Sequence, residues 1–409
     1  MTTVMHPGDA LTRAQRLVYI IVLGALVGLG PFTIDLYLPA FPVIEEQLRT
    51  SDTAIQLTLT ATTIGFGLGQ LLIGPLSDKV GRRWPLIAAT AVHILASVGV
   101  ALAPTVEWIT ALRVLQGVGA AGGGVVAMAM VRDLFGGQPL VRMLSRLALV
   151  TGLAPVLAPV IGSQLLLVVD WRGVFWALAA YGGLVILAAL LLIVETLPPA
   201  RRRDRGHSTA GERYKALFTD RIFIGVAVIG AMQFSALFTY LSASSFLLQD
   251  VYGLDAQQYG LVFGLNSLGL VVGNQISARI IRRVGPQWIM PWSLGAILLG
   301  SLAIVGSGAL WGGGIAGVLI PLFVILTACG FTFPCVQVLA LANHGKEAGT
   351  AASLLGAVNF GTAGAVSPIV GALGISTLAM GSVMAATIVV AILSLWFLVR
   401  PWTVPALEP

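Results

Sequence analysis

Two ionisable residues, Asp35 and Arg113, stand well inside long apolar stretches of the sequence, and His93 is a third polar group of this kind. A charge at the centre of a bilayer costs about 2.5–3.5 kcal/mol on insertion scales, so such residues normally face the protein interior. Burial favours the neutral form of a carboxyl group, whereas a nearby cation favours the carboxylate. Asp35 could therefore carry a proton, or it could be an acid close to the outer membrane surface.

Arg113 keeps its proton under all ordinary conditions and lies about two turns into its apolar stretch. It could tie backbone carbonyl groups together, or it could set the electric field around Asp35 and a substrate. Gln116 follows three residues later, close to the same helix face. His93 could be a packed or hydrogen-bonded histidine, or it could belong to a proton relay.

The segment GPLSDKVGRR, from Gly74 to Arg83, gathers one acid and three basic residues directly after an apolar run. Asp78 falls near the C-terminus of that run, where a helix dipole is already negative, so an acid needs a partner there. Arg82, one turn on, or the N-terminus of another helix could supply it. Gly74 and Gly81 permit close backbone approach. We interpret the segment as a cytoplasmic latch between two halves; the alternative is a basic cluster that only orients the chain.

The elements that carry these residues are predicted by composition. Of the 409 residues, 57% are hydrophobic and only 10% are charged, against about 25% charged in soluble proteins. Apolar runs long enough to span a bilayer alternate with short polar breaks, which predicts an all-α polytopic membrane protein with twelve spans. The predicted spans are 17–39, 54–76, 84–103, 107–130, 142–167, 172–194, 222–248, 257–280, 287–307, 314–341, 348–372 and 376–399.

The basic residues indicate how these spans are oriented. Every Lys and Arg except Arg49, Arg113 and Arg172 falls on the side of the chain termini. By the positive-inside rule, both termini and the long central loop are expected in the cytoplasm. We therefore expect a multi-pass protein of the inner (cytoplasmic) membrane.

The sequence also divides into two similar halves. A shift of 200 residues aligns GPLSDKVGRR with NQISARIIRR, which runs from Asn274 to Arg283, and APVIG (158–162) resembles SPIVG (367–371). Repeated halves are a common plan of secondary transporters. The predicted domains are an N-terminal six-helix bundle (1–196), a cytoplasmic linker (197–220) and a C-terminal six-helix bundle (221–409). Because Ala278 occupies the position of Asp78, we expect the second copy to lack the ion pair.

Several motifs resemble those of a known family. GPLSDKVGRR resembles motif A of the major facilitator superfamily, and LRVLQGVGAAGGG (112–124) resembles its motif B, with the arginine at Arg113. GLAPVLAPVIGS (152–163) resembles motif C of the proton-driven exporters, although Ala158 and Ser163 stand where glycines are often found. DLYLPAFP (35–42) and WRGVF (171–175) are similar to the bicyclomycin and chloramphenicol resistance (Bcr/CflA) subfamily. The first six spans carry most of the resemblance.

This resemblance implies the twelve-helix major facilitator fold and drug:proton antiport. It implies that Arg113 takes part in proton coupling and that the latch of Gly74, Asp78, Gly81 and Arg82 joins a charge relay with Asp133. In motif C, Pro155 and Pro159 are four residues apart and are expected to kink their helix. Gly152 and Gly162 allow neighbouring helices to approach, which could seal the outer side or could be simple packing.

The expected substrate cavity combines residues of both halves. Besides Asp35 and Arg113 it includes polar and aromatic candidates, although residues like those of the second half more often serve helix packing: Tyr37, Gln116, Gln233, Tyr240, Asn266, Phe331 and Asn359. Cys329 and Cys335 are expected to be inert core residues, and we expect neither a metal site nor a cofactor. The expected partners are a small-molecule substrate, protons and the lipid bilayer, without nucleic acid, for a protein that acts as a monomer.

The predicted function is proton-coupled efflux of small, largely apolar drugs or metabolites by alternating access. A proton-coupled importer of a small nutrient is the alternative on the same fold, but importers usually line their cavity with several polar or charged groups. A membrane receptor or enzyme is a third possibility. The sequence has no catalytic constellation and no GxxxxGKS/T phosphate loop, which argues against an enzyme and against an ATP-driven pump.

Overall fold

The computed structural model describes residues 7–199, 202, 210–310, 314–342, 344 and 348–404. All regular structure in these ranges is helical. Twelve of the helical segments are long and apolar enough to cross a membrane, which confirms the predicted all-α polytopic fold.

The first half contributes six spans, the first of which continues past a 3-10 turn into a short helix. Its helices are α1 (Arg13–Asp35), α2 (Phe41–Leu48), α3 (Asp52–Val80), α4 (Arg83–Leu102), α5 (Val106–Leu134), α6 (Gly137–Leu165) and α7 (Trp171–Leu192). A 3-10 turn, η2 (Leu38–Ala40), joins α1 to α2.

The second half repeats this order after a short connecting helix. Its helices are α8 (Ala210–Thr219), α9 (Arg221–Phe246), α10 (Ala256–Val284), α11 (Pro286–Leu310), α12 (Ala316–Ala342), α13 (Ala348–Val366), α14 (Ile369–Ala372) and α15 (Thr377–Ser394). Two π-helical turns, η4 (Leu247–Val251) and η5 (Leu395–Val399), extend α9 and α15.

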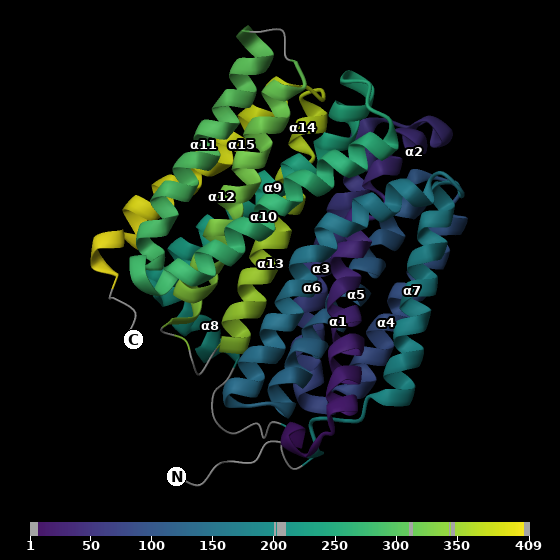
Figure 1. Ribbon diagram of the computed structural model, residues 1–409, viewed down its shortest axis with the longest axis vertical. Coiled ribbons are helices and arrows are strands. Elements are labelled where there is room, and N and C mark those ends of the chain that lie inside the picture. The colour runs from purple at the N-terminus through teal and green to yellow at the C-terminus, as the bar shows by residue number, and fades with distance from the viewer. Residues whose placement is uncertain are drawn as a thin grey trace.

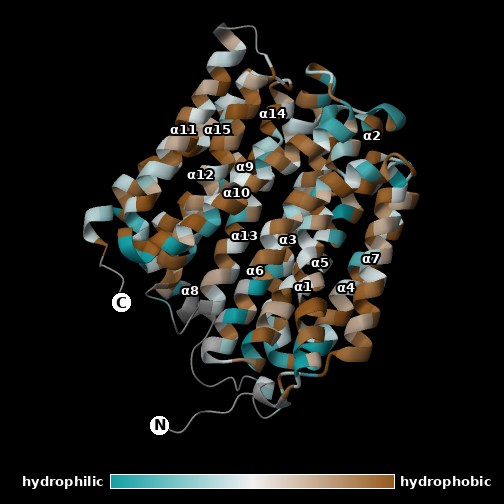
Figure 2. Cartoon of the chain, in the orientation of Figure 1, coloured by the Kyte–Doolittle hydropathy of each residue, from teal (hydrophilic) through white to brown (hydrophobic). Residues whose placement is uncertain are grey.

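The two halves lie side by side, with α1 to α7 on one side and α9 to α15 on the other (Figure 1). They meet where α3 packs on α13 and α6 packs on α10. In Figure 1, α2 lies at one end of the bundle, and α8 and the N-terminus lie toward the other. These are called the α2 end and the α8 end below. Hydrophilic residues gather at the two ends of the long helices, which are mostly hydrophobic between them (Figure 2).

A matched pair of close helix contacts shows that the halves are built alike. A Cβ atom on Gly117 of α5 would overlap the backbone of Thr62 in α3, and a Cβ on Gly330 of α12 would overlap the backbone of Leu270 in α10. Glycine is required at both positions because the helices touch through their backbones. The second and fourth spans of each half therefore form the same close pair.

The first span is not one unbroken α-helix. Its α-helical part, α1, ends at Asp35, and the candidate membrane span continues to Leu48 through η2 and α2. Pro39 has no N–H to donate to the carbonyl of Asp35, so the α-helical ladder cannot continue there. Pro31, in contrast, lies inside α1. The last part of the predicted linker 197–220 forms α8, whose Leu217 is buried in the core.

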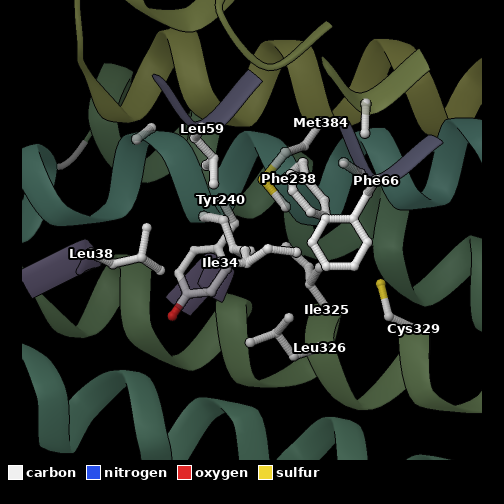
Figure 3. Close-up of a cluster of buried hydrophobic side chains, with 14 of the residues drawn as sticks. Ile34, Leu38, Leu59, Phe66, Phe238, Tyr240, Ile325, Leu326, Cys329 and Met384 are labelled. Atoms are coloured by element: carbon white, nitrogen blue, oxygen red, sulfur yellow. The ribbon is translucent and has the colours of Figure 1, made fainter. Parts of the chain in front are cut away.

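A continuous apolar core joins the halves. Figure 3 shows side chains from α1, α3, α9 and α12 in this cluster, among them Ile34, Leu59, Phe238 and Ile325. The two cysteines, Cys329 and Cys335, are free and buried in it. Most of the buried surface between the halves is therefore hydrocarbon, and any buried polar group in it stands out.

Candidate functional site

Asp35 is the last residue of α1 and is buried, with 3% of its surface exposed. Its Oδ1 atom has no hydrogen-bond partner, and no basic side chain pairs with it among the described residues. A buried carboxylate loses hydration that must be replaced by a partner or avoided by protonation. A proton-carrying role for Asp35 stays a prediction.

Arg113 is fully buried on α5, but it does not pair with Asp35. Its Nη1 donates to the carbonyl oxygen of Thr33 at 2.9 Å and to Oε1 of Gln116 at 2.6 Å. The carbonyl of Thr33 belongs to the last turn of α1, where helix carbonyls lack intrahelical donors and a cation is favourable. These contacts match the first alternative from the sequence, in which Arg113 binds backbone carbonyl groups.

Aromatic rings complete the surroundings of the guanidinium. Its Cζ lies 4.0 Å from the ring centroid of Tyr37 and 5.7 Å from that of Phe175, within the range of cation–π attraction. Tyr37 also contacts Phe41 and Phe175, at centroid distances of 4.9 and 5.5 Å. The segments DLYLPAFP and WRGVF, far apart in the sequence, thus pack together around one arginine.

One of the candidates from the second half, Tyr240, lies within electrostatic reach of Asp35. Tyr240 on α9 is fully buried and interacts with Asn266 on α10, with Tyr259 and electrostatically with Asp35. Tyr259, which the sequence had not singled out, shares a hydrogen bond of 3.1 Å with Ser244. The carboxyl group of the first half is therefore within electrostatic reach of two phenol groups of the second.

The remaining candidates of the second half lie apart from this group. Gln233 donates to the carbonyl of Cys329 at 2.9 Å, and Asn359 sits against Gly230. Phe331 offers its carbonyl to Ser277. No contact among the described residues joins Gln233, Asn359 or Phe331 to Asp35. Their contacts are those of helix packing, and a substrate-binding role for them stays a prediction.

At the α8 end, Arg82 organises the segment GPLSDKVGRR. It is 7% exposed and binds Oδ1 of Asp78 at 2.5 Å, Oδ2 of Asp133 at 2.8 Å and Oγ of Ser77 at 2.8 Å. Burial alone would lower the pKa of Arg82, but the hydrogen bonds and charges of Asp133 and Asp78 outweigh it and raise the pKa. These described partners of Arg82 all belong to the first half, so a latch from this cluster to the second half stays a prediction.

Glu195 completes this cluster and was missed by sequence reasoning. Its carboxylate accepts the backbone N–H groups of Arg82 at 2.8 Å, of Arg83 at 3.2 Å and of Leu197 at 2.9 Å. Burial raises its pKa, but these donors and the charge of Arg202 prevail, so the pKa lies below its ordinary value. The only sequence signal was an acid immediately after a span in an otherwise basic loop.

Gly81 is required by both its conformation and its neighbour. Its φ of 103° lies in the region that favours glycine, and a Cβ there would stand 2.5 Å from Oε2 of Glu195. Gly74, the other glycine of this segment, is less crowded, since a Cβ there would stand 3.4 Å from the Val125 side chain. The turn between α3 and α4 can therefore close only with glycine at position 81.

The second copy of the segment is built differently. Ala278, Arg282 and Arg283 are exposed, and neither arginine forms an ion pair with a described residue. Ser277, like Ser77, is buried, but it donates to the carbonyl of Phe331 in α12. Both copies carry basic residues, but among described residues only the first copy forms ion pairs.

At the α2 end, the helix of motif C lies against both α1 and α10. α6 runs through Pro155 and Pro159 as one helix. A Cβ on Gly162 would overlap the carbonyl oxygen of Leu36, next to Asp35, and a Cβ on Gly260 of α10 would stand 2.9 Å from the carbonyl oxygen of Pro159. Gly152, in contrast, has open space around it apart from Val271 at 3.9 Å.

Hydrogen bonds close the same end. Between described residues, four side-chain hydrogen bonds join the two halves, and all lie at the α2 end. They are Gln56 to the carbonyl of Ser242 (3.3 Å), Ser245 to that of Leu38 (2.6 Å), Gln249 to that of Pro39 (3.2 Å) and Gln257 to that of Ser163 (3.1 Å). The halves are thus fastened to one another just beyond Asp35.

Comparisons of this sequence with family models and with known proteins agree on one family. A family model described as the Major Facilitator Superfamily matches residues 23–368. An uncharacterized MFS-type transporter of Bacillus subtilis (strain 168), YdgK, is 33% identical over 391 residues, covering 95% of this chain and 97% of the relative. A bicyclomycin resistance protein homolog of Haemophilus influenzae is 28% identical over 391 residues, covering 93% and 96%. The multidrug resistance protein MdtL of Escherichia coli (strain K12) is 32% identical over 243 residues, covering 59% and 61%.

Solved structures share the fold at low identity. A bacterial homolog of the human lysosomal transporter Spinster, in an inward-facing and unoccupied conformation, has a TM-score of 0.71 and 15% identity, covering 96% of this chain and 98% of that chain. A D-xylose–proton symporter has a TM-score of 0.71 and 15% identity, covering 97% and 100%. At this identity the likeness extends to the fold alone.

Proposed function

This chain belongs to the Major Facilitator Superfamily and resembles its Bcr/CflA branch, and from that premise we propose that it exports small, largely apolar drugs or metabolites in exchange for protons. The observation that carries the proposal is the buried carboxyl of Asp35, which forms no ion pair with a described residue and has one oxygen without a hydrogen-bond partner. A carboxyl in this setting can be occupied either by a proton or by the polar group of a substrate. Competition between the two couples export to proton entry.

The second support is the position of Asp35 relative to the fastened end. The four hydrogen bonds between the halves and the Gly162 contact with Leu36 all lie at the α2 end. We place this end outside the cell, because the basic loops lie at the other end. The conformation is then closed to the outside, and both termini lie in the cytoplasm. Opening must break these contacts and so expose Asp35 to external protons.

The third support concerns the kind of substrate. The apolar core that joins the halves begins at Ile34, beside Asp35 in the chain, and includes the aromatic side chains of Phe66, Phe238 and Tyr240 (Figure 3). Phe66 of the first half stacks on Phe360 of the second, with ring centroids 5.1 Å apart. Such a surface favours lipophilic molecules and would discriminate little among them. Two relatives are named for bicyclomycin or multidrug resistance, which agrees with this class of substrate.

We assign the Arg82 cluster to state changes. Arg82 and its carboxylate partners hold the α8 ends of α3, α4 and α5 as one unit, with Glu195 joining the end of α7. A unit held in this way can move rigidly against the second half during alternating access. The chain acts as a monomer in the cytoplasmic membrane, since each chain contains both halves.

The experiment is transport into inverted membrane vesicles in the presence and absence of a pH gradient. Ethidium and chloramphenicol serve as a cationic and a neutral probe. An exporter driven by protons accumulates at least one of them only with an acidic vesicle interior, and collapse of the gradient releases it. Uptake in the opposite direction would identify an importer, and binding without transport would identify a receptor. Either result would overturn the proposal.

A further inference from the structure

His93 lies at the centre of α4, which packs directly on the Arg113 helix α5, and is fully buried. Its Nε2 atom is 2.8 Å from the hydroxyl oxygen of Thr33 on α1. Its Nδ1 atom is buried without a hydrogen-bond partner. One side of the ring is therefore bonded to α1, and the other side is not bonded at all.

The neighbouring hydroxyl decides which nitrogen carries the proton. Thr33 donates its only hydroxyl hydrogen to the carbonyl of Leu29, at 2.6 Å. The same oxygen can then only accept from His93, so Nε2 must carry a hydrogen. The tautomer of a histidine is set by such partners.

The opposite nitrogen has no place for a second proton. Nδ1 faces α7 at Gly182, where a Cβ atom would stand 3.3 Å away. A hydrogen on Nδ1 would be a buried donor without an acceptor, in a ring that already feels the positive charge of Arg113. The ring is thus built to stay neutral, with Nε2 as its donor.

The bond joins a closed network around the end of α1. Arg113 binds the carbonyl of Thr33, Gln116 binds Arg113 and donates to Ser97 at 2.8 Å, and Ser97 donates to the carbonyl of His93 at 2.7 Å. Thr33 is therefore held through both its carbonyl and its hydroxyl, two residues before Asp35. The carbonyl of Thr33 lies in the last turn of α1, where helix carbonyls lack donors of their own helix, so this turn depends on outside partners.

We infer that His93 is a positioning residue that stays neutral as the Nε2–H tautomer and, through Thr33, holds the α1 turn that carries Asp35. It carries no proton in the transport cycle. The expected effect of His93 on transport rests on the proposed function. The tautomer and the hydrogen bond to Thr33 follow from the contacts of His93 and do not depend on that function.

The test has a spectroscopic arm that does not require transport. The full-length protein is labelled with ¹⁵N-histidine and reconstituted in lipid, and the His93 signals are assigned by their loss in His93→Gln. Neutral and charged rings, and the two neutral tautomers, differ in their ¹⁵N shifts. We expect one neutral Nε2–H form throughout the range from about pH 5 to pH 8 in which unperturbed histidines titrate. A titration of His93 in that range, or an Nδ1–H form, overturns the inference.

The transport arm uses amide replacements. The Nε2 of Gln lies at the same chain position as the Nε2 of His, whereas the amide of Asn matches Nδ1. His93→Gln should therefore keep most of the pH-driven transport rate with an unchanged pH profile, and His93→Asn and His93→Leu should lose about tenfold. Equal losses in folded Gln and Leu variants would overturn the inference in favour of a relay. If wild-type protein shows no pH-driven transport, the proposed function fails, while the tautomer remains testable.

Discussion

The carboxylate of Glu195 accepts a hydrogen bond from the backbone N–H of Arg82 at 2.8 Å, across 113 residues of chain. Arg82 is the N-cap of α4, and with Arg83 it presents N–H groups that have no acceptor within their own helix. The carboxylate is also favoured by the positive end of the helix dipole. The end of the first half is thereby tied to the turn that carries the Arg82 cluster.

We expect Glu195→Gln to lower stability by about 1 kcal/mol, because the uncharged amide is a weaker acceptor at a partly exposed site. The pKa of Glu195 is lowered in the folded protein, so its contribution is present above the unfolded pKa of about 4.3 and is lost as the pH falls through the folded value. The difference from wild type should thus be constant near neutrality and should disappear in acid. Thermal unfolding of purified protein at a series of pH values measures it. Glu46→Gln, on the exposed face of α2, is the control, and a difference that grows in acid would contradict the assignment.

Asp35→Asn is expected to abolish pH-driven export while membrane abundance stays normal. Asn keeps the shape of the side chain but cannot bind or release a proton, and an amide is tolerated where no cation pairs with the carboxyl. Transport into inverted vesicles is measured for the variant and for wild type at matched membrane abundance. Substrate flux without a pH gradient is measured in the same vesicles. Export by the variant against a gradient at the wild-type rate would remove Asp35 from the coupling mechanism.

Asp78→Asn is expected to slow turnover without changing substrate affinity, since Asp78 contacts Arg82 far from the Asp35 site. A group that acts on state populations changes rates of interconversion rather than the binding surface. Equilibrium binding of a fluorescent substrate and transport by the same preparation separate the two quantities. Lost binding with normal conformational cycling would refute the role in state changes.

The two basic clusters should respond unequally to the same substitution. Arg82→Gln removes bonds to Asp78 and Asp133 and leaves Asp133 largely buried, whereas Arg282 is exposed and unpaired among the described residues. We expect about a tenfold loss of transport for Arg82→Gln and little change for Arg282→Gln. Both variants are compared at equal abundance in the membrane. Equal defects would mean that both clusters only orient the chain.

The two glycines of motif C provide a matched pair. A Cβ on Gly162 would overlap the carbonyl oxygen of Leu36, whereas a Cβ on Gly152 would meet only Val271 at 3.9 Å. Gly162→Ala is therefore expected to lower stability by about 1–3 kcal/mol, typical of overpacking, and to impair transport through α1. Gly152→Ala should be nearly neutral. Thermal unfolding and vesicle transport are measured for both variants. Equal losses of stability and transport in the two variants would argue against the close contact of α6 with α1.

The local features of this protein follow from its sequence. Spans, their grouping into two halves and the charge at the α8 end are visible because hydropathy and helical spacing act over short distances. Asp78 and Arg82 are four residues apart, so their pairing within one turn could be anticipated from spacing alone. The end of α1 is a local feature of the same kind, because Pro39 has no N–H to donate to the carbonyl of Asp35.

The contacts between distant segments depended on packing that no local pattern encodes. Arg113 donates to the carbonyl of Thr33, 80 residues away in the chain. This is possible because α5 packs on the last turn of α1, where carbonyl groups lack donors from their own helix. Glu195 reaches Arg82 because α7 ends beside the turn between α3 and α4. Tyr240 approaches Asp35 only because the two halves close over each other at the α2 end. Burial and partner together determine what a polar group can do, and both are properties of the tertiary structure.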